Sequence, residues 1–118
     1  MAAIFYLSAL SSPPVPGNVN DKLLHTIEYF GLGLLVFRAI AGGLLRRPSA
    51  TTVAFCLLIT VAYAASDEMH QFFTPDRTPD VRDLLADATG ATLALIVTWA
   101  CHIIASSSTR ASNPKSQL

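Results

Sequence analysis

The chain is short of charge. Only 14% of its 118 residues are Asp, Glu, Lys or Arg, against 52% that are hydrophobic, whereas an ordinary soluble domain carries about 25% charged residues. Acidic and basic residues balance at eight each, so no basic surface favours nucleic acid as a partner. The sequence also lacks a phosphate-cradling glycine loop and a dinucleotide fingerprint, which argues against ATP-driven transport by this chain.

Cysteine is equally scarce. Cys56 and Cys101 each lie inside an apolar run, where a small buried apolar side chain is the expectation. Two such residues cannot form the disulfide framework of a small secreted domain. The length and the lack of an internal repeat indicate one domain.

Long apolar runs are what the chain has instead. They cover roughly residues 23–43, 51–69 and 84–105, each close to the ~20 residues that a helix needs to cross a bilayer. A fourth apolar piece, residues 2–10, is too short to cross. We therefore expect an all-α integral membrane bundle of three full transmembrane helices plus a short or truncated N-terminal helix. This transmembrane domain covers residues 1–105, and a polar, disordered tail follows at 106–118.

The basic residues predict an orientation. Five of them fall on one side of the predicted spans and three on the other, namely Arg38, Arg46, Arg47, Arg110 and Lys115 against Lys22, Arg77 and Arg82. Because short cytoplasmic loops carry an excess of Lys and Arg, the Arg46-Arg47 loop and the tail are expected in the cytoplasm. The opposite helix ends then face the outside of a cell (inner) membrane.

All eight acidic residues lie in two blocks at these outer ends, 21–28 and 67–87. Charge is costly within a bilayer, so the gathering of acidic residues at these helix ends indicates that they serve a function. In the first block His25, Glu28 and Tyr29 share a helix face. His-x-x-Glu is a spacing that divalent-metal sites in helical bundles use. Alone it is a weak pattern, so His25 and Glu28 are only weak metal candidates and no cofactor is predicted.

The second block begins at the end of the second span. Asp67 pairs by spacing with His70 and Gln71, while Glu68 points to a neighbouring face, toward a partner such as Lys22 or Arg77. These residues end the helix at the predicted membrane surface. Simple solvation therefore explains Asp67 and His70 as well as a function does.

The third span opens with an acidic stripe. Asp80, Asp83 and Asp87 recur at spacings of three and four, and Gly90 and Ala94 continue the same stripe. Small residues let membrane helices approach closely, so this stripe predicts that Asp83 and Asp87 point into the bundle. By position along their helices, Asp87 and Glu28 are the deepest acids. A purely structural network of buried salt bridges explains the same pattern.

Three spaced motifs carry a resemblance to a known family. They read Asp21-Lys22-x-x-His25-x-x-Glu28-Tyr29-x-x-Leu32-Gly33, then Ser66-Asp67-Glu68-x-His70-Gln71-x-Phe73-x-Pro75-x-Arg77, then Asp80-x-x-Asp83-x-x-x-Asp87-x-x-Gly90. With them, the chain from about residue 7 to 105 resembles the VanZ-like family of bacterial membrane proteins.

This resemblance implies a four-helix membrane protein of the bacterial cell envelope. It also implies a link to low-level teicoplanin resistance, the antibiotic resistance with which the founding member of the family is associated. Asp76 and Asp87 depart from the family pattern, which often has glycine and asparagine there. The added charge of Asp87 argues against a purely neutral hydrogen-bonding role.

Three functional hypotheses follow. In the first, the polar residues at the outer helix ends bind a polar ligand, such as an envelope lipid, a cell-wall intermediate or a glycopeptide. In the second, the protein is a membrane-embedded enzyme acting on such molecules, with or without a metal. In the third, the polar network is structural and the protein acts through partners. Beyond the lipid bilayer no partner is specified, and no catalytic residue is assigned. The candidate site residues are Lys22, His25, Glu28, Tyr29, Asp67, Glu68, Gln71, Arg77, Asp80, Asp83 and Asp87.

Overall fold

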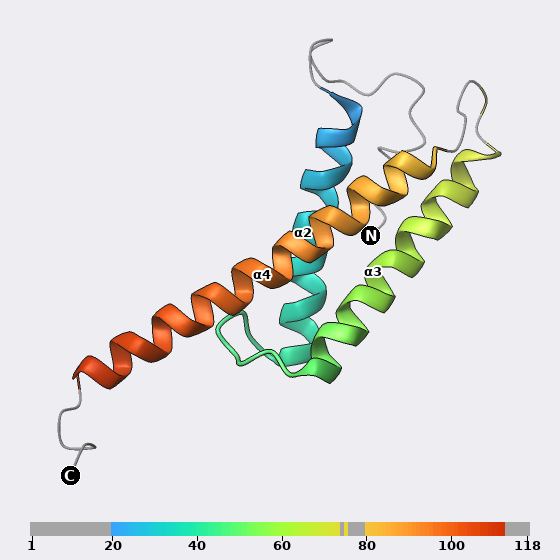
Figure 1. Ribbon diagram of the computed structural model, residues 1–118. Helices are drawn as coiled ribbons and strands as arrows, with labels where there is room; N and C mark the ends of the chain where they lie inside the picture. Colours follow the sequence, from blue (N-terminus) through green and yellow to red (C-terminus); the bar gives the residue numbers. More distant parts are fainter. Residues whose placement is uncertain (1–19, 74, 76–79, 113–118) are drawn as a thin grey trace.

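The computed structural model describes residues 20–73, 75 and 80–112, and this part of the chain forms three α-helices (Figure 1). Each is long and apolar enough to cross a membrane, which confirms the predicted all-α fold with three full spans. The short N-terminal helix predicted over residues 2–10 lies outside the described residues. The helices are α2 (Asp21–Ala41), α3 (Ala50–Gln71) and α4 (Val81–Ser112).

Local signals set the ends of α2 and the start of α3. The Asn20 side chain accepts a hydrogen bond from the Lys22 backbone N–H at 3.0 Å, and Ser49 Oγ accepts one from the Thr52 N–H at 3.1 Å. Both residues are N-caps, which satisfy backbone donors that have no partner within the helix. Gly42 ends α2 with a φ of 74°, a left-handed conformation that glycine adopts without a steric penalty.

The helix α4 is longer than the apolar run that predicts it. It continues to Ser112, into the stretch where the sequence predicts a polar tail. The hydroxyls of Ser106, Ser107 and Thr109 donate to carbonyls of the preceding helical turn, which lets these polar side chains remain within a helix. At 1.5 Å per residue, the 32 residues of α4 extend about 48 Å, more than the hydrocarbon core of a bilayer is thick.

Glycine allows α2 and α4 to cross at backbone contact. A Cβ at Gly90 would overlap the Thr26 carbonyl oxygen and would lie 2.8 Å from the Phe30 backbone nitrogen. A Cβ at Gly33 would lie 2.9 Å from the Ala94 Cβ. This contact confirms the small-residue face predicted on the third span, and Figure 1 shows α4 running across α2.

The pattern of burial fits a membrane protein. A small core packs where the helices meet, whereas Leu35, Leu58 and Ile104 are each more than 60% exposed on the outside, where lipid would cover them. No described residue of α4 beyond Thr98 is buried, because this end of the helix diverges from the bundle (Figure 1). The expectation of a buried Cys101 is therefore wrong, whereas Cys56 is buried. The core residues are Tyr29, Leu32, Val36, Phe37, Cys56, Ala64 and Leu95.

The helix crossing yields the first testable prediction. Gly90→Ala should lower the free energy of unfolding by about 1–3 kcal/mol, because the new methyl group meets backbone that no rotamer change can move. Gly31→Ala is the matched control, since a Cβ at Gly31 has nothing within 4 Å, and it should stabilise the helix by about 0.5–1 kcal/mol. Thermal unfolding in detergent measures both variants. Equal midpoints for the two would contradict the crossing described here.

Candidate functional site

Polar side chains gather where the start of α2, the end of α3 and the start of α4 meet. The part nearest the helix ends, here called the outer tier, centres on the Lys22 ammonium. Lys22 Nζ lies 3.2 Å from Asp80 Oδ2 and also pairs with Asp83 Oδ1. The side chains of Lys22 and Asp80 are 38% and 43% exposed, whereas that of Asp83 is 7% exposed. The tier thus runs from the surface into the bundle, and one cation serves two carboxylates.

Asp80 and Glu68 join the outer tier to the helix ends. Asp80 Oδ1 accepts a hydrogen bond from the Arg82 backbone N–H at 2.9 Å and so caps α4. This bond, followed by the Lys22 ammonium, holds the pKa of Asp80 below its ordinary value. Glu68 Oε2 accepts from the Asp80 backbone N–H at 3.0 Å. This bond ties α3 to the start of α4, whose backbone N–H groups attract a carboxylate.

The predicted pairing of Glu68 with Lys22 is therefore wrong. The first turn of α4 offers Glu68 a backbone donor, and Asp80 and Asp83 already surround the Lys22 ammonium. Arg77, the other predicted partner of Glu68, lies outside the described residues, as does Asp76.

The inner tier lies one helical turn deeper and draws on all three helices. His25 Nδ1 of α2 lies 2.9 Å from Asp87 Oδ1 of α4, and both side chains are buried. Tyr29 follows one turn after His25 on α2, and Asp67 comes from α3; each is 1% exposed. Tyr29 interacts electrostatically with both Asp67 and Asp87, and the two carboxylates interact with each other. The inner tier is thus His25, Tyr29, Asp67 and Asp87.

Several buried polar atoms of the cluster lack a hydrogen-bond partner among the described residues. In the inner tier they are Tyr29 Oη, Asp67 Oδ1 and Asp87 Oδ2, one from each helix, and Glu68 Oε1 adds a fourth. A buried polar group without a partner costs about 1–3 kcal/mol. Because folded proteins seldom retain several such groups together, they are a sign of function.

The structure shows which of these side chains face the interior of the bundle. Asp67 and Gln71, placed by sequence at the solvated helix end, are each 1% exposed, so solvation does not explain Asp67. They belong to an inward stripe of α3 at spacings of three and four, which was present in the sequence as a signal: Cys56, Thr60, Ala64, Asp67 and Gln71. Glu28, predicted among the deepest acids, is only half-buried, and His70 is exposed.

The stripe predicted on α4 is confirmed, since Asp83 and Asp87 are both buried. One contributor was missed by sequence reasoning. Thr26 Oγ1 donates to the Ala86 carbonyl at 3.3 Å and to the Lys22 carbonyl at 2.9 Å. The sequence signal that could have indicated this contact was the threonine next to His25 on the first apolar helix.

The arrangement gives no support to the metal candidates. Among residues 20–73, 75 and 80–112, no three His, Cys, Asp or Glu side chains are placed so that they could hold a metal ion. His25 directs Nδ1 to Asp87.

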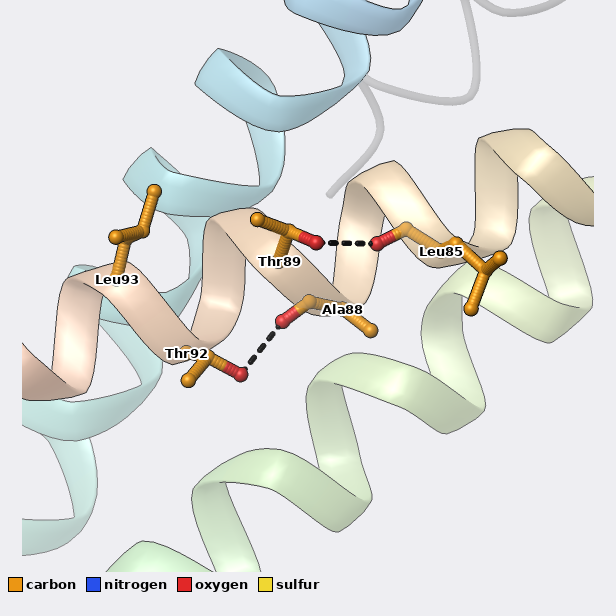
Figure 2. A pocket seen from close by; sticks show the side chains of 5 residues that line it. All are labelled: Leu85, Ala88, Thr89, Thr92 and Leu93. Atoms are coloured by element: carbon orange, nitrogen blue, oxygen red, sulfur yellow. Dashed lines mark hydrogen bonds between the residues drawn. The ribbon is translucent and has the colours of Figure 1, made fainter.

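A shallow hollow elsewhere on α4 is apolar in character (Figure 2). Its two threonines are satisfied by their own helix, because Thr89 Oγ1 donates to the Leu85 carbonyl at 2.7 Å and Thr92 Oγ1 to the Ala88 carbonyl at 2.8 Å. With Leu93 these residues line the hollow, on the face of α4 turned away from Asp87. The hollow is separate from the polar cluster.

A family model described as VanZ/LLP1 matches residues 3–105, nearly the whole chain. No curated protein and no solved structure matches this sequence. The matched region contains all three helices up to Ala105 and every residue of both tiers.

Two carboxylates that share one lysine provide a matched test of the outer tier. Asp83→Asn should lower the free energy of unfolding by about 1.5–3 kcal/mol, because it removes a charged partner at a buried position. Asp80→Asn should cost less, because that side chain is exposed and asparagine still caps a helix. Urea or thermal unfolding in detergent measures the difference. An equal loss in both variants would show that burial of Asp83 contributes nothing.

Proposed function

The chain belongs to the VanZ/LLP1 family, and from that membership we propose that it is a cell-envelope membrane protein that binds a polar envelope ligand at its extracytoplasmic surface. The binding site is the polar cluster of the two tiers. Envelope lipids, cell-wall intermediates and glycopeptides are the ligand classes in question. The coarse identity, a membrane protein of this family, rests on the family match and on three helices of membrane-spanning character.

One observation carries this proposal. The inner tier collects buried polar atoms with no partner among the described residues, and each helix supplies one of them. A network that served only to hold the helices together would be expected to pair such atoms, since each unpaired atom destabilises the fold. The outer tier grades from exposed to buried, which gives a polar ligand a direction of approach from the helix ends.

The orientation of the site is part of the proposal. His102 Nδ1 of α4 lies 3.0 Å from the Leu45 carbonyl in the loop between α2 and α3. Arg46 and Arg47 in this loop and Arg110 near the end of α4 therefore all lie toward the end of the bundle opposite the polar cluster. The positive-inside rule assigns that end to the cytoplasm, and the polar cluster then faces outward.

Reporter fusions test this orientation. A fluorescent protein that matures only in the cytoplasm should fluoresce when fused after Leu118, and alkaline phosphatase fused at the same position should be inactive. Both reporters read the location of the C-terminal end of α4, and so of the basic end of the bundle. An active phosphatase fusion with a dark fluorescent fusion would place the polar cluster in the cytoplasm instead.

Isosteric amide variants separate binding from stability. Asp67→Asn retains shape and removes the charge of a carboxylate whose Oδ1 has no hydrogen-bonded partner among the described residues, so the membrane level of the protein should hold while function falls at least about tenfold. Glu28→Gln, Asp83→Asn and the charge-preserving Arg77→Lys complete the set, and Thr92→Val, on the face of α4 turned away from Asp87, is the control. Teicoplanin susceptibility of an expressing strain is measured beside protein level. If every loss of phenotype tracks a loss of protein, the network is structural.

A membrane-embedded enzyme is the second candidate, and the His25–Asp87 pair favours it. A carboxylate that accepts from one imidazole nitrogen orients the ring, which suits the other nitrogen to acid–base work. Incubation of the purified protein with labelled envelope lipid or cell-wall intermediate distinguishes the two candidates. Bound but chemically unchanged ligand supports the binding role, whereas a new product that disappears with His25→Gln supports the enzyme.

A further inference from the structure

The unused hydrogen-bonding capacity of the polar cluster is almost entirely that of an acceptor. Asp67 Oδ1, Glu68 Oε1 and Asp87 Oδ2 are carboxylate oxygens that are buried and lack a partner among the described residues. An ionised carboxylate accepts hydrogen bonds and cannot donate them. The remaining atom, Tyr29 Oη, can do both. A ligand that satisfies this set must therefore bring donors.

The charges of the cluster point the same way. An anionic ligand would need Lys22 and His25 as its receptors. The structure commits Lys22 to Asp80 and Asp83, and it sets His25 against Asp87. In the inner tier two carboxylates face one imidazole, which carries at most a single positive charge. One further positive charge would balance this group, and balance is a strong requirement for buried charges.

The outer tier is an example of the chemistry that the inner tier calls for. The Lys22 ammonium lies between carboxylates of the same stripe of α4 and hydrogen bonds to both. An ammonium group carries three donors and no acceptor. One turn deeper, Asp87 Oδ2 and Asp67 Oδ1 lack such a group. No three-residue metal-ligand set exists among the described residues, whereas hydrogen bonds from an ammonium need none.

We propose that the inner tier binds the primary ammonium group of a ligand that enters from the outer end of the bundle. Asp67 and Asp87 accept its N–H groups, and the Tyr29 hydroxyl lies beside them. This inference rests on the proposed binding function and adds the chemical class of the ligand. Two sources supply such a group at an outer membrane surface, an aminophospholipid headgroup and a soluble amine.

Lipids with different headgroups show whether binding requires N–H donors or depends only on headgroup charge. The full-length protein is purified into nanodiscs of phosphatidylcholine, and phosphatidylethanolamine or phosphatidylglycerol is titrated in while native mass spectrometry counts retained lipids. Phosphatidylethanolamine should be retained at least about tenfold more strongly than phosphatidylcholine, whose quaternary ammonium has no N–H to donate. Preferential retention of phosphatidylglycerol, an anionic lipid without an amine, would overturn the proposal.

A soluble pair of probes separates the two sources. Methylammonium should raise the unfolding temperature of the protein in detergent, and tetramethylammonium at the same concentration should not, because a bound ligand stabilises the folded state. A response to methylammonium without lipid selectivity assigns the site to soluble amines. Retention of phosphatidylethanolamine without a response to methylammonium assigns it to the lipid headgroup. No preference for N–H donors in either assay overturns the proposal.

Asp67→Asn tests the assignment to the inner tier, and Thr92→Val, on the face of α4 turned away from Asp87, is its control. Asp67→Asn should weaken retention of phosphatidylethanolamine or methylammonium by about tenfold to a hundredfold, while Thr92→Val should leave it unchanged. Asp87→Asn is a second variant for the same tier and is interpreted only where its unfolding temperature matches that of the unmodified protein. Equal binding by Asp67→Asn and Thr92→Val would overturn the assignment.

The failures of the two proposals can be told apart. If the protein binds teicoplanin or a cell-wall intermediate but shows no selectivity for N–H donors, only the ammonium inference fails. If it binds none of these ligands and Asp67→Asn leaves the phenotype intact, the proposed function fails as well.

Discussion

The approach of α4 to the backbone of α2 is the contact on which the rest of the structure depends. At Gly90 there is no room for a Cβ, because the carbonyl of Thr26 occupies its place. Apolar side chains give little net driving force between helices in lipid, so close packing and hydrogen bonds must hold them. The same approach sets Lys22 against Asp83 and His25 against Asp87, each pair a helical turn apart. Packing and polar pairing are therefore one arrangement.

The sequence predicted the helices and the inward direction of the acids on α4, because both follow from periodicity. Three apolar runs of spanning length and a stripe that combines carboxylates with Gly90 and Ala94 contain that information locally. The end of α4 was less predictable. Serine and threonine are equally compatible with a disordered tail and with a helix in which their hydroxyls bond to carbonyls of the preceding turn.

Partners and burial were harder to predict than helices. Position along a helix indicates depth in a membrane, but it does not indicate which side of the helix faces protein. Asp67 and Glu28 show the difference, since the residue placed nearer the surface is the more buried of the two. The partner of Glu68 was missed for another reason. A backbone N–H at the start of α4 leaves no trace in the residue pattern, whereas charged side chains do.

The two tiers place different demands on the fold. In the outer tier every described charge has a partner, and two of its side chains retain contact with solvent, so the cost of holding them is small. The inner tier is enclosed and only partly paired, which is costly in a medium of low dielectric constant. Evolution can retain such an arrangement as a purely structural device, but then full pairing would stabilise the bundle more. The incomplete pairing of these buried polar atoms therefore argues for a binding role rather than a purely structural one.

Of the three described helices, α3, which supplies Asp67, shares the least contact with the other two. α3 shares less contact with α2 and with α4 than those two helices share with each other, and at its outer end the Glu68 hydrogen bond to the Asp80 backbone attaches it to α4. The unpartnered oxygen of Asp67 thus belongs to α3, the described helix with the least contact to its neighbours. A ligand held between Asp67 and Asp87 would add a link between α3 and α4. Binding and helix packing would then be coupled, because any ligand that binds only the closed arrangement of helices stabilises that arrangement.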